Sequence, residues 1–344
     1  MENRDNKNNR RDFLKSLAGL TAGMMLPLTA TPSGLGGSEI NSTAARNVDR
    51  FGELLPLRKF GRSGKSITML GLGGAHIARM SDAEAEKTIE KALEEGVRFF
   101  DNAESYGAGE GERKYGRFLT PKYRDIAFIQ SKTTARDGKT AQAHLEGTLK
   151  RMNTDYLDLY YIHAVTSPAD VDARLKNGVL DVLVKAKKEG KVRHIGFSGH
   201  SDFNAHLRML EVTDLMEACQ MPINAFDPNY KSFITNVLPI LSEKQIAPVA
   251  MKTLANGGFF GGTSHFNHGD NAKIVPAVLS IQEALHFSWS MPISTLVTGA
   301  DNAAMLLEKV ELARNFRMMD EGKRQQLVEK VASFDGRLVE YYKV

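Results

Sequence analysis

Three ionisable residues of this chain recur at a spacing of 31 positions, and each lies at the end of a short apolar run. They are Asp101, Lys132 and His163. One strand–helix unit takes about 30 residues, so we expect the three side chains at equivalent ends of consecutive strands. Tyr106 follows Asp101 by five residues, within the next loop. We therefore expect all four side chains to meet at one end of the strands.

A phenol, an ammonium, a carboxylate and an imidazole together suit proton transfer to an oxygen. A phenol has a pKa of about 10 in water, and a neighbouring Lys132 ammonium is expected to lower it. Asp101 would compensate the charge of a buried Lys132, and a neutral His163 would donate a hydrogen bond to a substrate oxygen. This set suits protonation of the alkoxide formed in carbonyl reduction, or the reverse oxidation of an alcohol. The hydride must come from a cofactor, because no side chain supplies one.

Short apolar runs alternate with amphipathic stretches from residue 56 onward. Expected strands cover residues 67–73, 99–103, 126–132, 156–163, 194–198, 218–223, 248–252 and 294–299. They are apolar almost throughout, as is typical of parallel strands buried on both faces. Helical patterns lie between them, for example one that begins at the N-cap Ser81 and ends at Gly96. Eight such units predict an α/β protein, a single-domain (β/α)8 TIM barrel, with residues 60–65 as a hairpin turn at its floor.

An open doubly wound sheet is the alternative fold. It needs a glycine-rich turn with the spacing G-x-G-x-x-G after its first strand. Gly71, Gly73 and Gly74 lie at that place, but their spacing differs from this motif. The barrel therefore remains the preferred fold.

The composition is that of an ordinary globular protein. Apolar residues make up 42% and charged residues 25%, and 45 basic against 41 acidic side chains leave a net charge of +4. No basic stripe stands out, so we expect no nucleic-acid partner. The single cysteine, Cys219, cannot form an internal disulfide or a multi-thiolate metal site. No later stretch predicts a stable membrane anchor.

The first thirty residues have the pattern of an export signal. Arg10 and Arg11 precede Phe-Leu-Lys, a mild apolar run follows to residue 30, and small residues come next. Residues 1–30 resemble a twin-arginine signal peptide, which implies the twin-arginine export machinery as a partner and a periplasmic location. We expect residues 31–55 to be a flexible linker and residues 56–344 to form the barrel. After export the cofactor that supplies the hydride would have to stay bound, or an unidentified electron partner would have to reduce it.

Several segments now carry a resemblance to the aldo-keto reductase family. They are FDNAESYG at residues 100–107, FIQSK at 128–132, DLYYIH at 158–163, IGFS at 195–198 and AMKTL at 250–254. The similarity runs from about residue 57 to residue 313. It implies a barrel that binds NADP or NAD without a Rossmann domain, and an NAD(P)-dependent enzyme acting on a small carbonyl or alcohol. It also implies Tyr106 as the general acid/base, with Asp101, Lys132 and His163 as its partners.

The same resemblance assigns residues to the cofactor. Ser198 and Gln220 would hold the nicotinamide, and the further cofactor residues would be Gly73, Gly199, Lys252, Thr253, Leu254, Gly299, Ala300, Asp301, Met305, Glu308 and Lys309. Members of the family often have Asn after the serine, whereas Gly199 and His200 stand here, and His200 is a candidate substitute. Asp301 would repel a 2′-phosphate and Met305 replaces a polar contact, so we expect NAD to bind at least as well as NADP.

Other functions remain open at this point. His76, His200, Tyr106 and His163 are the candidate substrate-binding residues. An epimerase with a retained cofactor and a non-catalytic nucleotide sensor are the alternatives to a reductase. His265 and His268 lie in a loop, 256–271, that we interpret as a flap over the cofactor rather than as a metal site, so no metal is expected.

Overall fold

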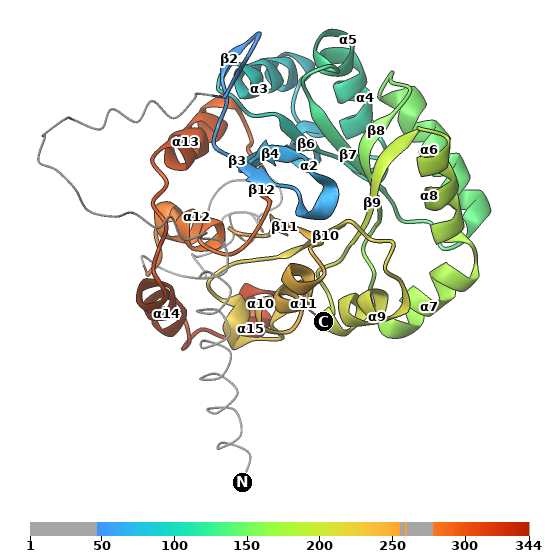
Figure 1. Ribbon diagram of the computed structural model, residues 1–344. Coiled ribbons are helices and arrows are strands. Elements are labelled where there is room, and N and C mark those ends of the chain that lie inside the picture. The colour runs from blue at the N-terminus through green and yellow to red at the C-terminus, as the bar shows by residue number, and fades with distance from the viewer. Residues whose placement is uncertain (1–46, 255–258, 260–277, 344) are drawn as a thin grey trace, which may run out of the picture.

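Parallel strands of the computed structural model close into a barrel (Figure 1). The structure describes residues 47–254, 259 and 278–343. Within them, the barrel strands follow one another in chain order, and the last pairs in parallel with the first. They are β5 (Leu70–Gly73), β6 (Phe99–Asp101), β7 (Phe128–Thr133), β8 (Leu157–Ile162), β9 (Val192–Ser198), β10 (Ala218–Pro222), β11 (Ala247–Met251) and β12 (Thr295–Thr298). The closed ring confirms the (β/α)8 barrel and rules out the open sheet, which would leave two unpaired edges.

Helices form the outer layer around these strands (Figure 1). Those of eight or more residues are α3 (Asp82–Glu94), α4 (Glu110–Phe118), α6 (Gly138–Arg151), α7 (Pro168–Lys176), α8 (Val179–Lys188), α9 (Phe203–Val212), α12 (Ile281–Trp289), α13 (Ala303–Arg314) and α14 (Glu321–Lys330). Shorter turns are α2 (Gly74–Ile77), α5 (Thr120–Tyr123), α10 (Phe233–Asn236), α11 (Leu238–Glu243), α15 (Gly336–Val339), η1 (Gly61–Ser63) and η2 (Asp227–Asn229). No helix in the described part of the chain is long and apolar enough to cross a membrane.

Strand β8 shows why the barrel strands are mostly apolar. All six of its residues are buried. Leu159 and Tyr161 belong to the cluster inside the barrel, whereas Tyr160 and Ile162 belong to the larger core outside it. Successive side chains of a strand point to opposite faces, so a strand between the barrel interior and the helices is apolar on both faces, apart from Asp158, which pairs with Arg124 and Arg193.

The expected hairpin closes one end of the barrel. Strands β3 (Leu57–Lys59) and β4 (Ser66–Thr68) pair in antiparallel fashion, and the completely buried Phe60 packs with Ala218 and Ala247, the first residues of β10 and β11. This end is therefore the floor. The first barrel strand begins at Leu70 rather than at residue 67, because residues 66–68 pair with the hairpin instead.

The expected linker is too long at its C-terminal end. Residues 47–55 belong to the folded unit, with β1 (Val48–Asp49) paired to β2 (Gly52–Glu53). Asp49 accepts two hydrogen bonds from Arg98, at 2.6 and 2.7 Å, and Leu55 is buried. The folded part thus begins before residue 56. The proposed signal peptide, 1–30, lies outside the described residues, as does most of the proposed linker.

Candidate active site

The four residues that the spacing singled out lie together at the barrel end opposite the floor hairpin. Asp101 ends β6, Lys132 is the penultimate residue of β7, and His163 directly follows β8. Tyr106 lies in the loop after β6, and its ring meets that of His163 edge-to-face with centroids 5.9 Å apart. Parallel strands place their carboxyl ends on one side of a barrel, so chain register alone brings these groups to one mouth.

Lys132 is the hub of the cluster. Its side chain is 1% exposed. The ammonium Nζ donates to Asp101 Oδ1 at 2.5 Å, to the Asn102 carbonyl at 2.6 Å and to the Tyr106 hydroxyl at 3.3 Å. Burial opposes the charged form, but Asp101 and Tyr106 outweigh it and raise the pKa of Lys132. The lysine is therefore a charged donor to Tyr106 at neutral pH.

The pKa of Tyr106 moves in the direction opposite to the one expected from the sequence. Burial is the largest influence and raises the pKa, while the Lys132 charge lowers it and Asp101 raises it again. The net pKa lies above the ordinary value of 10.0, because the sequence argument counted the ammonium but not the desolvation. Tyr106 is thus a neutral phenol at physiological pH, and Lys132 limits the cost of forming its phenolate.

His163 is a neutral imidazole in this environment. Burial, followed by the charge of Lys132, holds its pKa well below the ordinary value. Its Nδ1 is buried and has no hydrogen-bond partner among the described residues. A neutral ring has one N–H, and a proton on Nε2 leaves the buried Nδ1 as the unprotonated nitrogen. This tautomer gives His163 a donor for an oxygen in the mouth.

Gln130 is a member of the site that the sequence analysis missed. Its Nε2 donates to Asp101 Oδ1, and it also lies 3.3 Å from Gln220 Oε1. Gln220 Nε2 reaches the same Asp101 oxygen at 3.4 Å. Gln130 precedes Lys132 by two residues, so both side chains point to the same face of β7. A polar residue two positions before the lysine in an apolar strand was the signal that could have identified it.

Two buried hydroxyls at the mouth fit a polar ligand. Ser198 Oγ, at the end of β9, and Thr253 Oγ1, two residues after β11, are buried and have no hydrogen-bond partner among the described residues. An unpaired buried hydroxyl is costly unless a ligand or water satisfies it. Both residues were assigned to the cofactor, and a nicotinamide carboxamide or a phosphate oxygen can satisfy each of them. The residues present therefore fit a nicotinamide cofactor.

The departure at Gly199 has a steric cause. A Cβ at this buried position would lie 2.6 Å from the Val165 carbonyl oxygen and 2.7 Å from Cε1 of His206. His206 is fully buried, and burial lowers its pKa to about 3. Asn, with its Cβ, has no room here. His200 Nδ1 lies 3.3 Å from the Tyr342 carbonyl oxygen and its ring packs edge-to-face on Tyr342; its role as a substitute contact stays a prediction.

The loop after β12 carries the carboxylate of Asp301, and Lys309 of the following helix is buried. Asp301 Oδ1 lies 3.8 Å from Nε2 of His76. The ring of His76 also covers Gly299, because a Cβ on Gly299 would lie 2.0 Å from this ring. Lys309 donates to the Gly299 carbonyl, and burial lowers its pKa to about 8. Lys309 is therefore a buried support for this loop rather than a surface charge. Met305 and Glu308 are exposed, and Ala300 is buried.

The remaining assigned cofactor residues end strand β5 or follow strand β11. Gly73 ends β5, where a Cβ would meet the Thr298 carbonyl at 3.1 Å. Lys252 has a positive φ of 60°, and its Nζ lies 5.2 Å from the ring centroid of Tyr342. Burial lowers the pKa of Lys252 to about 8. Leu254 is partly buried against the core, and the proposed flap, 256–271, lies outside the described residues.

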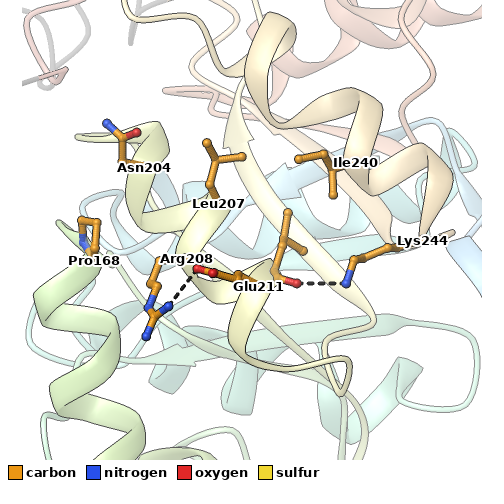
Figure 2. Close-up of a pocket in the computed structure, with 8 residues that line it drawn as sticks. Pro168, Asn204, Leu207, Arg208, Glu211, Ile240 and Lys244 are labelled. Atoms are coloured by element: carbon orange, nitrogen blue, oxygen red, sulfur yellow. Dashed lines mark hydrogen bonds and ion pairs between the residues drawn. The ribbon is translucent and has the colours of Figure 1, made fainter.

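Outside the mouth, the described residues do not suggest a second active site. No group of three or more His, Cys, Asp or Glu among the described residues could hold a metal ion, and His265 and His268 lie outside those residues. Cys219 is buried, and burial raises the pKa of its thiol. A surface groove (Figure 2) lies among the outer helices, and its lining residues are Pro168, Asn204, Leu207, Arg208, Leu210, Glu211, Ile240 and Lys244. None of these was expected in the site.

Comparison with known proteins agrees with this barrel. Residues 69–291, well over half of the chain, match the model of the Aldo/keto reductase family. An uncharacterized oxidoreductase of Bacillus subtilis is 24% identical, with 77% of this chain and 93% of the relative covered. The L-glyceraldehyde 3-phosphate reductase of Escherichia coli is 26% identical over 61% of this chain and 64% of its own length.

Solved structures show the same architecture. The holo form of an aldo-keto reductase from Bacillus halodurans has a TM-score of 0.68 at 19% identity, over 82% of this chain and 98% of that one. The glycerol dehydrogenase of Gluconobacter oxydans has a TM-score of 0.64 at 18% identity, over 81% and 95%. At such identities these likenesses establish the fold, while the family model covers the strands that carry Asp101, Lys132 and His163. The chain therefore belongs to the aldo/keto reductase family and is an oxidoreductase.

Proposed function

We propose that this protein interconverts a carbonyl and an alcohol on a small molecule with a nicotinamide cofactor. The observation that carries the proposal is the contact of Tyr106 with a buried, charged lysine, next to a neutral histidine. The bound nicotinamide would supply or accept the hydride. Ser198 and Thr253 would hold it through the hydroxyls described above.

The chain's own residues would then handle the proton. His163 donates a hydrogen bond to the substrate oxygen and orients the carbonyl. Tyr106 gives its hydroxyl proton to that oxygen as negative charge develops there. Lys132 stabilises the phenolate that remains, and Asp101, held by Gln130 and Gln220, keeps Lys132 in place. In the reverse direction Tyr106 takes the proton from the alcohol.

Replacement of Tyr106 by phenylalanine tests the assigned acid. The ring is retained, so we expect the fold and the dissociation constants of NAD(H) and NADP(H) to stay within about twofold. Loss of a positioned acid typically costs 10²–10⁴-fold in rate. Reduction of para-nitrobenzaldehyde and glyceraldehyde, followed by nicotinamide absorbance, measures it. Unchanged turnover in Tyr106→Phe would overturn the assignment.

We also propose that NAD binds at least as well as NADP. Asp301 supports this, because a carboxylate disfavours a 2′-phosphate dianion, and Lys309 is already bound to the Gly299 carbonyl. Titration of the purified protein with both nucleotides tests it. Tenfold tighter binding of NADP would refute the proposal, and Asp301→Asn should improve NADP binding without a matching gain for NAD.

Export through the twin-arginine machinery to the periplasm is the last part of the proposal. It rests on Arg10 and Arg11 and the apolar run after them. Fractionation of cells that express the full chain should find a shortened protein in the periplasm. The variant with both arginines replaced by lysine should remain in the cytoplasm at full length. Equal distribution of the two proteins would contradict the proposal.

A further inference from the structure

Glu104 fastens the loop that carries Tyr106 to the end of the neighbouring strand. Its Oε1 accepts hydrogen bonds from the Thr134 backbone N–H at 2.8 Å and from the Thr134 hydroxyl at 2.5 Å. The same oxygen lies 3.3 Å from Nδ1 of His144 on α6. Thr134 follows Lys132 by two residues. Glu104 thus joins the segment of the proposed acid to the segment of the lysine that contacts it.

The loop needs such a contact. Its residues Gly107, Ala108 and Gly109 all have positive φ angles, of 59°, 52° and 86°. The backbone of the loop therefore makes a sharp turn immediately after Tyr106. The backbone link between this loop and β7 at the same place is long, with Glu104 N 3.5 Å from the Lys132 carbonyl. The Tyr106–Lys132 contact is itself 3.3 Å. The two bonds to Thr134, at 2.8 and 2.5 Å, are shorter than both of these contacts.

The Glu104 carboxylate is buried, which is costly for a group with a purely structural role. The Glu104 side chain is 8% exposed, and its Oε2 has no hydrogen-bond partner among the described residues. A buried carboxylate costs more than a neutral acceptor with the same bonds. Its charge also reaches the site, since Glu104, like Asp101, raises the pKa of Tyr106 while Lys132 lowers it.

We propose that Glu104 is a positioning residue of the acid/base step, which holds the Tyr106 hydroxyl against Lys132 by fastening its loop to Thr134. The inference rests on the proposed function of Tyr106. Its charge adds a second effect: it keeps Tyr106 protonated to higher pH. The titratable groups around Tyr106 include Asp101 from β6, Lys132 from β7, His163 after β8, Tyr115 on α4 and Glu104 from its own loop.

Two substitutions separate the effect of the Glu104 hydrogen bonds from the effect of the Glu104 charge. Glu104→Ala removes both, and we expect kcat for para-nitrobenzaldehyde to fall by about tenfold or more, with KM and the dissociation constant of the nucleotide within about twofold. Glu104→Gln keeps an acceptor oxygen for Thr134, so kcat should stay within about threefold. Because Gln is neutral, the alkaline limb of its pH profile should move to lower pH, by about half a unit.

Hydrogen exchange gives a readout that needs no substrate. The amide of Thr134 and the amides of residues 102–111 should exchange about tenfold faster in Glu104→Ala, and at the parent rate in Glu104→Gln. Glu110→Gln is the matched control, because Glu110 lies at the start of α4 and pairs on the surface with Arg113 and Arg117. It should leave kcat, the pH profile and the exchange rates unchanged.

Parallel measurement of Tyr106→Phe separates the two proposals. If Tyr106→Phe is inactive and both Glu104 variants behave as the parent protein, the positioning role is wrong and the acid assignment stands. If Tyr106→Phe is fully active, the acid assignment fails, whatever Glu104 does. An alanine variant with parent kcat, or with parent exchange at Thr134, would overturn the inference. So would a Gln variant that loses as much kcat as the Ala variant.

Discussion

Substitution of Gly199 by alanine tests the steric explanation for the departure from the family pattern. The new Cβ would lie 2.6 Å from the Val165 carbonyl oxygen and 2.7 Å from His206. Carbon atoms at favourable contact lie about 3.5–4.0 Å apart. The backbone at Val165 is tied to the same strand end, because Val165 N donates to the Ser198 carbonyl at 2.9 Å. The clash therefore cannot be relieved by movement of a side chain alone.

The expected cost follows from these contacts. Overpacking of a core typically costs about 1–3 kcal/mol, and a clash with fixed backbone belongs at the upper end. We expect Gly199→Ala to lower the free energy of unfolding by about 2–3 kcal/mol, measured by urea denaturation. Gly322→Ala is the control, since a Cβ there on helix α14 meets nothing closer than 3.5 Å. That change should stabilise the protein by about 0.5–1 kcal/mol.

A double variant identifies the contact responsible. His206→Ala removes one of the two clashing groups, so its effect and that of Gly199→Ala should not be additive. We expect the double variant to be more stable than the sum of the single effects by about 1 kcal/mol. Additive effects, or a Gly199→Ala protein as stable as the parent, would refute the reasoning.

Two further predictions concern the barrel floor. Glu217 binds His194 and Lys187 at 2.9 and 2.5 Å, and these contacts together with a backbone N–H outweigh burial and lower its pKa from 4.5 to about 2. The ionised Glu217 therefore stabilises the folded state by an amount on the order of 2–3 kcal/mol. This stabilisation is complete above pH 4.5 and is lost as the pH falls towards 2. The Glu217→Gln variant should lack this pH-dependent loss of stability in acid unfolding, and acid unfolding profiles identical to those of the parent protein would contradict the prediction. Phe60→Ala should cost about 3–5 kcal/mol of stability and leave nucleotide affinity unchanged, as unfolding and titration of the same sample would show; weakened nucleotide binding would argue against a purely structural floor.

The sequence predicted the barrel and the convergence of its polar strand ends for one physical reason. The hydrophobic pattern of a strand is a local property of the sequence: β8 is apolar except at Asp158, because both of its faces are covered. The 31-residue spacing of Asp101, Lys132 and His163 then places them at equivalent ends of adjacent strands. No contact had to be known for either prediction.

Other properties depend on distances across the barrel. The predicted direction of the Tyr106 pKa shift was wrong, because tertiary packing sets the balance between burial, which raises this pKa, and the Lys132 charge, which lowers it. The position of His200 beside Tyr342 likewise depends on segments far apart in the chain. The ion pair of Asp49 with Arg98, which helps to hold residues 47–55 on the folded unit, also joins segments far apart in the chain.

The amino-acid sequence by itself determined which residue types reach the mouth of the barrel, since strand register and repeat length are encoded locally. Only the tertiary structure decided their protonation, their partners and the space left around them. Desolvation and steric exclusion are sums over all neighbours, and the neighbours of Gly199 or Glu104 come from strands and helices that the chain brings together only on folding.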